Sequence, residues 1–189
     1  MVYPIDYALM LAAGGPWATL ANQLNVQQLA SENEFNALCK NIAVMGAELF
    51  PSATTSKRFL ELLKETQPAE KNKRIPTPWG GVYVISYDET TKDYDKYLIV
   101  KGGNWLAFEK HSQKLEKLVV ELGIGILLFR DKTDGKISMR DFQEGATVTF
   151  QPGEEHCLIA INDLVVRECG VDHKGMDQDL IFIYMPPLK

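Results

Sequence analysis

Three side chains with metal-binding chemistry lie close together in the segment 102–123, GGNWLAFEKHSQKLEKLVVELG. Glu109 and His111 are two positions apart, and side chains at positions i and i+2 of a strand point to the same side of a sheet. Glu116 follows five positions after His111, beyond a short turn, where the next strand can return its carboxylate to the same space. The spacing therefore predicts that two glutamates and a histidine enter one cavity.

A second histidine, His156, completes a possible ligand set. Two carboxylates and two imidazoles suit one divalent transition metal, and the set accepts Zn, Mn, Fe, Ni or Co without selecting among them. Without Glu109, the remaining His111, Glu116 and His156 would form the two-histidine, one-carboxylate set of non-haem iron oxygenases. Because ligands must be deprotonated to bind a metal, we expect the metal and protons to compete. The third histidine, His173, lies in the polar sequence VDHKGMDQD and is expected to be exposed.

The residues around these positions alternate in the manner of short strands. Beyond residue 79, β-branched and aromatic residues dominate, and Gly, Asp, Asn and Pro separate the apolar runs. Turn residues at intervals of about 8 to 12 positions are typical of a β-sandwich or β-barrel. We expect ten strands, with the sequences GGVYVISY, DKYLIV, NWLAFEKH, KLVVEL, IGILLFR, KISMRDF, ATVTFQP, HCLIAI, LVVREC and DLIFIYMP.

The first part of the chain has a helical pattern instead. PIDYALMLAA and PWATLANQLN are expected to form two helices separated by Gly14 and Gly15. Ser31 and Glu34 form a capping box for a third helix, ENEFNALCKNIAVMGAELF, and a fourth, SKRFLELLKE, begins at Ser56.

We therefore predict a mainly β protein with an N-terminal helical segment at 1–68, a linker at 69–78 and a β-barrel at 79–189. The linker prediction is based on TQPAEKNKRIPTP, which is polar and contains three prolines. The apolar stripes of the helices need a partner, and the nearest one is a face of the barrel.

Composition limits the classes of partner. The chain of 189 residues is 46% apolar and 24% charged, with a net charge of −5, and its lysines and arginines form no basic stripe for a nucleic acid. The apolar run YALMLAA is far shorter than the ~20 residues that span a bilayer, and it lacks the features of a signal peptide. The three cysteines share no motif spacing. We expect a cytoplasmic protein with reduced thiols and with no membrane or nucleic-acid partner.

The metal-ligand positions resemble those of the cupin superfamily. The first cupin motif, G-x5-H-x-H-x(3,4)-E-x6-G, has its counterpart at Gly103, Glu109, His111, Glu116 and Gly123, with glutamate in place of the first histidine. The second, G-x5-P-x-G-x2-H-x3-N, has its counterpart at Gly145, Gln151, Gly153, His156 and Ala160, with the proline and the asparagine replaced. The resemblance implies a double-stranded β-helix, or jelly roll, that holds one divalent metal, and it implies a homodimer associated through a sheet edge.

A narrower resemblance covers 77–183 and concerns the cupin domain of type II mannose-6-phosphate isomerases. TPWGGVY is similar to the opening R-P-W-G-x-Y of that family, and Lys114 takes the position of an arginine that precedes the family's metal-binding glutamate. The family's arginine in the C-terminal tail falls on Phe182. This resemblance implies a metal-dependent aldose–ketose isomerase that uses metal-polarised enediol chemistry, with Lys114 and Glu109 as catalytic candidates.

The ligand is expected to be a small carbohydrate-like molecule. The missing tail arginine favours a neutral sugar over a sugar phosphate, and the sequence does not place Lys96, Lys101 or Arg130 in the pocket. Two alternatives stay open: a non-catalytic cupin that binds a sugar, and a non-haem iron oxygenase or lyase.

Overall fold

The computed structural model describes residues 31–50, 55–66, 69–71, 73–130, 132, 135–175 and 177–187. Both later helices are present: α3 (Glu32–Leu49) and α4 (Lys57–Glu65). Ser31 accepts a hydrogen bond from the backbone N–H of Glu34, and Ser56 accepts one from Phe59, so the two predicted N-caps are confirmed. The two helices expected earlier in the chain lie outside the described residues.

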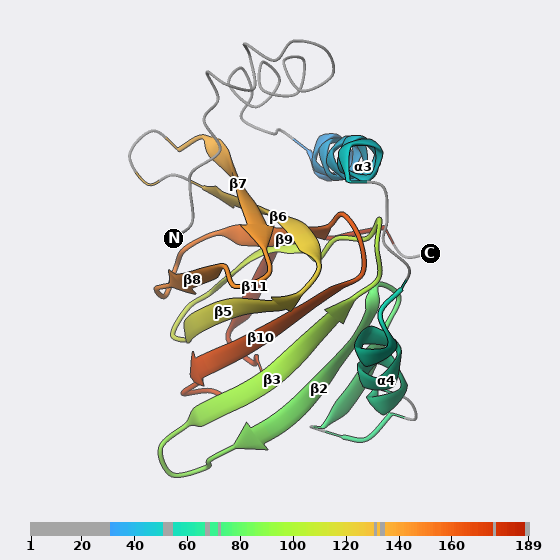
Figure 1. Ribbon diagram of the computed structural model, residues 1–189. Coiled ribbons are helices and arrows are strands. Elements are labelled where there is room, and N and C mark those ends of the chain that lie inside the picture. The colour runs from blue at the N-terminus through green and yellow to red at the C-terminus, as the bar shows by residue number, and fades with distance from the viewer. Residues whose placement is uncertain are drawn as a thin grey trace.

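All ten expected strands are present, and with one further strand they form two antiparallel sheets that face each other (Figure 1). The first sheet has the order β1-β2-β3-β10-β5-β8 and the second has the order β11-β4-β9-β6-β7. The strands are β1 (Arg74–Thr77), β2 (Gly80–Tyr87), β3 (Asp93–Val100), β4 (Phe108–His111), β5 (Leu115–Leu122), β6 (Ile124–Arg130), β7 (Ile137–Gln143), β8 (Thr147–Phe150), β9 (His156–Ala160), β10 (Leu164–Val171) and β11 (Leu180–Tyr184).

Strand β1 falls in the stretch that we expected to be a linker. Its four residues pair with β2, and Pro76 lies opposite Gly81. Proline cannot donate to a ladder, but it is tolerated on an edge strand, and β1 is at the edge of its sheet. Because of these prolines the sequence pattern of this edge strand is that of a linker, and the strand was not predicted.

Period-two alternation divides the apolar residues among three clusters. Leu98 and Val100 of β3 point between the sheets with Leu127 of β6, whereas the intervening Ile99 points outward. The inner cluster fills one part of the space between the sheets, where Leu118, Val120, Phe142, Leu158, Ala160, Leu164 and Val166 join it. The other part contains the polar side chains described below.

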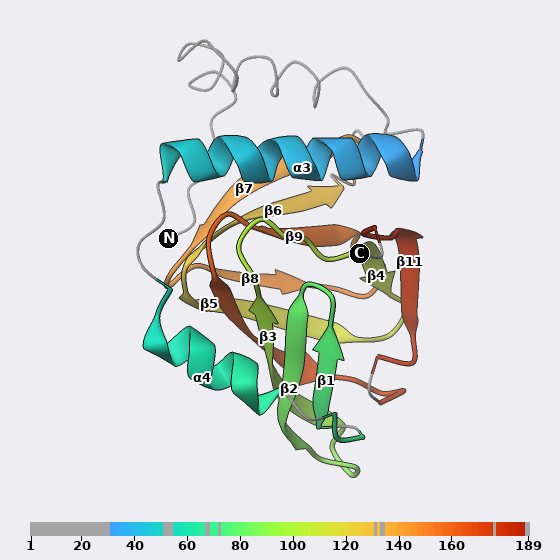
Figure 2. The same cartoon turned by 90° about the vertical axis from the view of Figure 1, so that its right-hand side faces the viewer.

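The two helices cover opposite outer faces (Figure 2). Helix α3 buries Phe35, Leu38 and Ile42 against the second sheet, and Phe35 stacks on Tyr184 with 5.3 Å between ring centroids. Helix α4 packs Phe59 and Leu62 against Ile99 and Val165 of the first sheet. No helix within the described ranges has the length and apolarity to cross a membrane.

Candidate functional site

The five residues singled out in the sequence line one cavity between the sheets. Its volume is about 320 Å³, and its wall includes Glu109, His111, Lys114, Glu116 and His156. The sheet register explains the convergence, because Glu109 of β4 lies directly opposite His156 of β9. Glu116 of β5 comes from the facing sheet, on the inward side of its strand. The predicted grouping around one cavity is therefore present.

The His156 imidazole and the Glu116 carboxylate form a buried ion pair. Their Nε2 and Oε2 atoms are 3.0 Å apart, and the imidazole stacks on Phe150 with 3.9 Å between ring centroids. Burial alone would lower the pKa of His156, but the charge of Glu116 raises it. Burial would likewise raise the pKa of Glu116, but His156 and Lys114 hold it well below its usual range. The pair therefore favours the imidazolium form of His156 and the carboxylate form of Glu116.

His111 is oriented by the carboxylate of Asp179, which lies just before β11. Its Nδ1 lies 2.8 Å from Asp179 Oδ1, and Asp179 Oδ2 accepts the backbone N–H groups of Gln113 and Lys114. Burial and the nearby Lys114 ammonium lower the pKa of His111, so the neutral imidazole is favoured. With Nδ1 engaged, Nε2 is the nitrogen left for the cavity, and it lies 3.5 Å from Lys114 Nζ.

Glu109 differs from Glu116 in its charge state. Burial raises the pKa of the Glu109 carboxyl to about 8, and the positive charge of His156 only partly opposes the rise. Of the two enclosed carboxyl groups, Glu109 is thus favoured in the protonated form and Glu116 in the ionised form.

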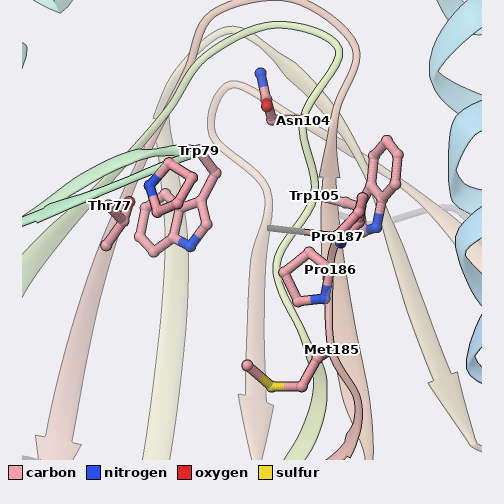
Figure 3. A pocket seen from close by; sticks show the side chains of 8 residues that line it. Thr77, Trp79, Asn104, Trp105, Met185, Pro186 and Pro187 are labelled. Carbon is pink, nitrogen blue, oxygen red and sulfur yellow. The ribbon is translucent and has the colours of Figure 1, made fainter. Parts of the chain in front are cut away.

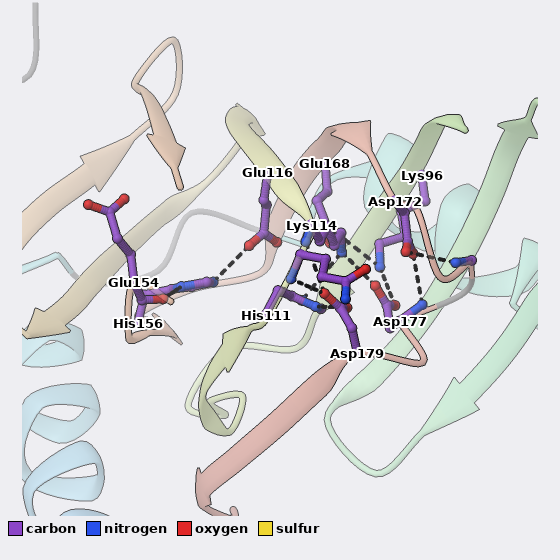
Figure 4. Close-up of polar contacts among 12 residues, drawn as sticks. Lys96, His111, Lys114, Glu116, Glu154, His156, Glu168, Asp172, Asp177 and Asp179 are labelled. Atoms are coloured by element: carbon purple, nitrogen blue, oxygen red, sulfur yellow. Dashed lines mark hydrogen bonds and ion pairs between the residues drawn. The ribbon is translucent and has the colours of Figure 1, made fainter. Parts of the chain in front are cut away.

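A second buried cluster adjoins these residues and was not predicted (Figure 4). Lys114 Nζ contacts Glu168 Oε1 and lies 2.5 Å from Asp177 Oδ1. Lys96 Nζ lies 3.1 Å from Glu168 Oε1 and 2.5 Å from Asp177 Oδ2. Each carboxylate therefore bridges the two ammonium groups, and all four side chains line the cavity.

The alternation of inward and outward positions along the strands could have predicted two members of this cluster, Lys96 and Glu168. Lys96 is two positions before Leu98, and Glu168 is two positions after Val166, so each shares the inward face of its strand. Asp177 gave no such signal, because it lies in a turn between β10 and β11 with a positive φ of 60°.

Two carboxylates and two imidazoles are donor types that divalent transition metals accept. Among the residues that the structure describes, no three His, Cys, Asp or Glu side chains are close enough together to enclose an ion as they stand. Two observations nevertheless favour a site. Glu116 Oε2 is buried and has its ion-pair contact to His156 Nε2, but no hydrogen bond of good geometry, within the described part of the chain. The Asp179–His111 contact is the outer carboxylate–histidine arrangement that typically orients a metal-binding imidazole.

An apolar hollow of about 140 Å³ adjoins the cavity (Figure 3). Thr77, Trp79, Met185 and Pro186 belong to the walls of both spaces. Trp105 lines the outer hollow, and its Nε1–H donates to Asn36 of α3 over 2.9 Å. The polar cavity thus has an apolar, partly aromatic hollow next to it.

The remaining charged residues considered from the sequence lie elsewhere, apart from Lys96. Glu121 is exposed on β5, and His173 is exposed as expected. Arg130 donates to Glu155, and Lys101 is exposed at a separate hollow.

Comparison with solved structures agrees with this architecture. Over 58% of this chain, the structure is similar to the capsular polysaccharide assembling protein CapF from Staphylococcus aureus, with a TM-score of 0.51 and 20% identity. It is also similar to oxalate decarboxylase from Bacillus subtilis, with a TM-score of 0.50 and 16% identity over 58% of this chain. The chain has a cupin fold. The similar region spans 31% of CapF and 29% of the decarboxylase, so the cupin similarity concerns a part of each protein. No family model and no curated protein matches the sequence.

Proposed function

We propose that this cupin is a metal-dependent enzyme that interconverts the aldose and ketose forms of a small sugar derivative. The observation that carries the proposal is the convergence of Glu109, His111, Lys114, Glu116 and His156 on one cavity of about 320 Å³. A space of this size, with a few polar groups and an apolar hollow next to it, suits a small molecule. The Bacillus subtilis oxalate decarboxylase, a protein of similar fold, has Mn(II) centres, which supports a metal in this cupin.

His111, Glu116 and His156 would hold the metal, and the Glu109 carboxyl would lie beside it, free to act on the substrate. A divalent ion bound there supplies Lewis acidity toward a substrate carbonyl. For that set to form, the Glu116–His156 contact must open, since Oε2 and Nε2 are the atoms that face each other. Asp179 keeps the His111 ring fixed, so this ligand needs no rearrangement.

Aldose–ketose exchange moves a proton between adjacent carbons, and the cavity has a group suited to that task. The pKa of Glu109, about 8, lies near neutral pH, where a general acid–base catalyst is most effective. Lys114 stays cationic, because the pKa of its ammonium is held high by Glu168, Glu116 and Asp177 despite burial. It can therefore orient a substrate oxygen by donation, while Glu109 carries the proton.

A metal-free binding cupin is the second candidate. One observation favours it: the Lys114 ammonium is 3.5 Å from His111 Nε2, and a resident cation at that distance opposes the entry of another.

Solvent-deuterium exchange separates the two candidates. The protein is incubated with Mn(II), Fe(II), Co(II), Ni(II) or Zn(II), its metal content is measured, and deuterium transfer from D₂O into a panel of aldoses, ketoses and their phosphates is followed. We expect about one metal per chain and exchange at the carbon next to the carbonyl. The H156Q variant should lose both, whereas H173Q, which changes an exposed histidine, should keep both. Sugar binding without metal or exchange would support the second candidate instead.

A further inference from the structure

Two lysine ammonium groups lie side by side in the cavity wall, which is an unusual arrangement. The side chains of Lys96 and Lys114 are 7% and 1% exposed. Buried lysines are rare unless their charges are compensated. Here Glu168 and Asp177 supply two negative charges to balance the two positive ones.

The two carboxylates hold the lysines in different ways. Glu168 belongs to the middle of the first sheet, on β10 between β3 and β5, and its side chain is only 3% exposed. Asp177 belongs to the turn before β11, and its side chain is 28% exposed. Glu168 is thus a fixed part of the wall, whereas Asp177 lies between the lysines and the solvent.

Asp177 places its oxygens as a bound oxyanion would. Oδ1 lies 2.5 Å from Lys114 Nζ, and Oδ2 lies 2.5 Å from Lys96 Nζ, so the carboxylate bridges both donors. A phosphate or a substrate carboxylate has two oxygens at similar separation and the same charge sign. The backbone N–H of Asp177 is held separately by Asp172 Oδ2 over 2.9 Å. The turn is therefore anchored by a contact that does not involve the Asp177 side-chain carboxylate.

We propose that Lys96 and Lys114 bind an oxyanion of the substrate, a phosphate or a carboxylate, and that the Asp177 carboxylate occupies this position until the substrate displaces it. The inference deepens the proposed function and rests on it for the identity of the reaction site. It assigns an anionic sugar derivative as the substrate class, in place of the neutral sugar expected from the sequence. Displacement keeps an anion beside the two lysines: a substrate carboxylate brings the same single charge as Asp177, and a phosphate brings a larger one.

Calorimetric titration of EDTA-treated protein tests the proposal without any metal. The probes are inorganic phosphate and malonate, which represent the two oxyanion classes. We expect the wild type to bind at least one probe saturably, and D177N to bind it about tenfold more tightly or better, because the internal competitor is gone. Binding of phosphate alone indicates a sugar phosphate, and binding of malonate alone indicates a sugar acid.

Variants of the lysines complete the design. D177N/K96M keeps Lys114 paired with Glu168, so it is charge-balanced and expected to fold, and it should lose the tight binding. D177N/K117M removes a lysine exposed on β5 and should retain it. The proposal is overturned if the wild type shows no saturable binding of either probe, if D177N binds no more tightly than the wild type, or if D177N/K96M still binds tightly. Anion binding by a protein that takes up no metal would instead overturn only the metal-dependent function.

Discussion

His156 and Glu116 form an ion pair across the cavity, with 3.0 Å between Nε2 and Oε2, although they belong to different sheets. The pair joins β9 to β5 in the part of the interior that the apolar cluster leaves polar. Both residues are also proposed metal ligands. The two side chains that stabilise the metal-free cavity are thus the same side chains that would bind the metal.

The pair gives the metal-free protein a defined pH range of greatest stability. The folded pKa of His156 is raised above 6.5, so its contribution is complete below pH 6.5 and is lost as pH rises through the folded pKa. The folded pKa of Glu116 is lowered below 4.5, so its contribution is complete above pH 4.5 and is lost as pH falls through the folded pKa. The stabilisation is therefore complete between pH 4.5 and 6.5.

Urea unfolding of H156Q in EDTA measures this contribution. Removing one partner of a buried pair typically costs about 3 to 5 kcal/mol, so the free energy of unfolding should fall by that order near pH 5.5. The loss should shrink at higher pH, where His156 is already neutral in the wild type. H173Q should match the wild type at every pH. An equal loss for H156Q at all pH values would show that packing on Phe150 matters, and the charge does not.

Glu109 is predicted to make the metal-free protein less stable as pH rises. Its folded pKa of about 8 exceeds the usual 4.5, so between these values the folded chain retains a proton that the unfolded chain has lost. Stability therefore falls over this interval, by roughly 3 to 5 kcal/mol if each pKa unit contributes about 1.4 kcal/mol. E109Q should remove that fall, and the exposed E121Q should leave it unchanged. A parallel pH profile for E109Q and the wild type would contradict the buried, protonated carboxyl.

Most of the fold could be predicted from the sequence because strands, turns and helix starts depend on residues that are close together in the chain. Period-two alternation and turn residues marked ten strands, and Ser31 and Ser56 marked two helix starts. Strand β1 gave no such signal, because a four-residue edge strand containing Pro76 depends on its single partner. Gly123 could be placed at a motif position, but its reason is tertiary: with φ of 92°, a Cβ there would lie 2.2 Å from the Asp163 carbonyl oxygen.

Only part of the site could be predicted from the sequence. The residues that were predicted lie in local motifs, and those that were missed contact the site from distant parts of the chain. The motif spacing pointed to His111 and His156, and parity turned both toward the interior. The same parity places Lys96 of β3 on the inward face, but Lys96 lies outside the two motifs that indicated the metal ligands. Asp177 and Asp179 act across the cavity from a turn, and their partners lie more than sixty positions earlier in the chain. No local pattern specifies such pairs.

Helix α3 is predicted to belong to the same cooperative unit as the barrel. Phe35 is fully buried and lies 5.6 Å from the Phe108 ring, measured between centroids. F35A should lower the free energy of unfolding by about 3 to 5 kcal/mol, because it removes a large side chain and leaves a cavity. V44A changes an exposed position of the same helix, and it should stay within about 0.5 kcal/mol of the wild type. A small effect of F35A would mean that the barrel folds independently of α3.

Asp179 is predicted to control metal affinity without touching the metal. It holds His111 through Nδ1, and an asparagine would retain an acceptor but lose the negative charge that makes the imidazole a better ligand. D179N should bind Mn(II) and Zn(II) about 10- to 100-fold more weakly in a chelator competition. D163N, which alters a carboxylate that accepts the Gly102 N–H away from the cavity, should bind like the wild type. Unchanged affinity in a folded D179N would exclude His111 as a ligand oriented in this way, and the metal site would then have to be built from Glu109, Glu116 and His156 alone.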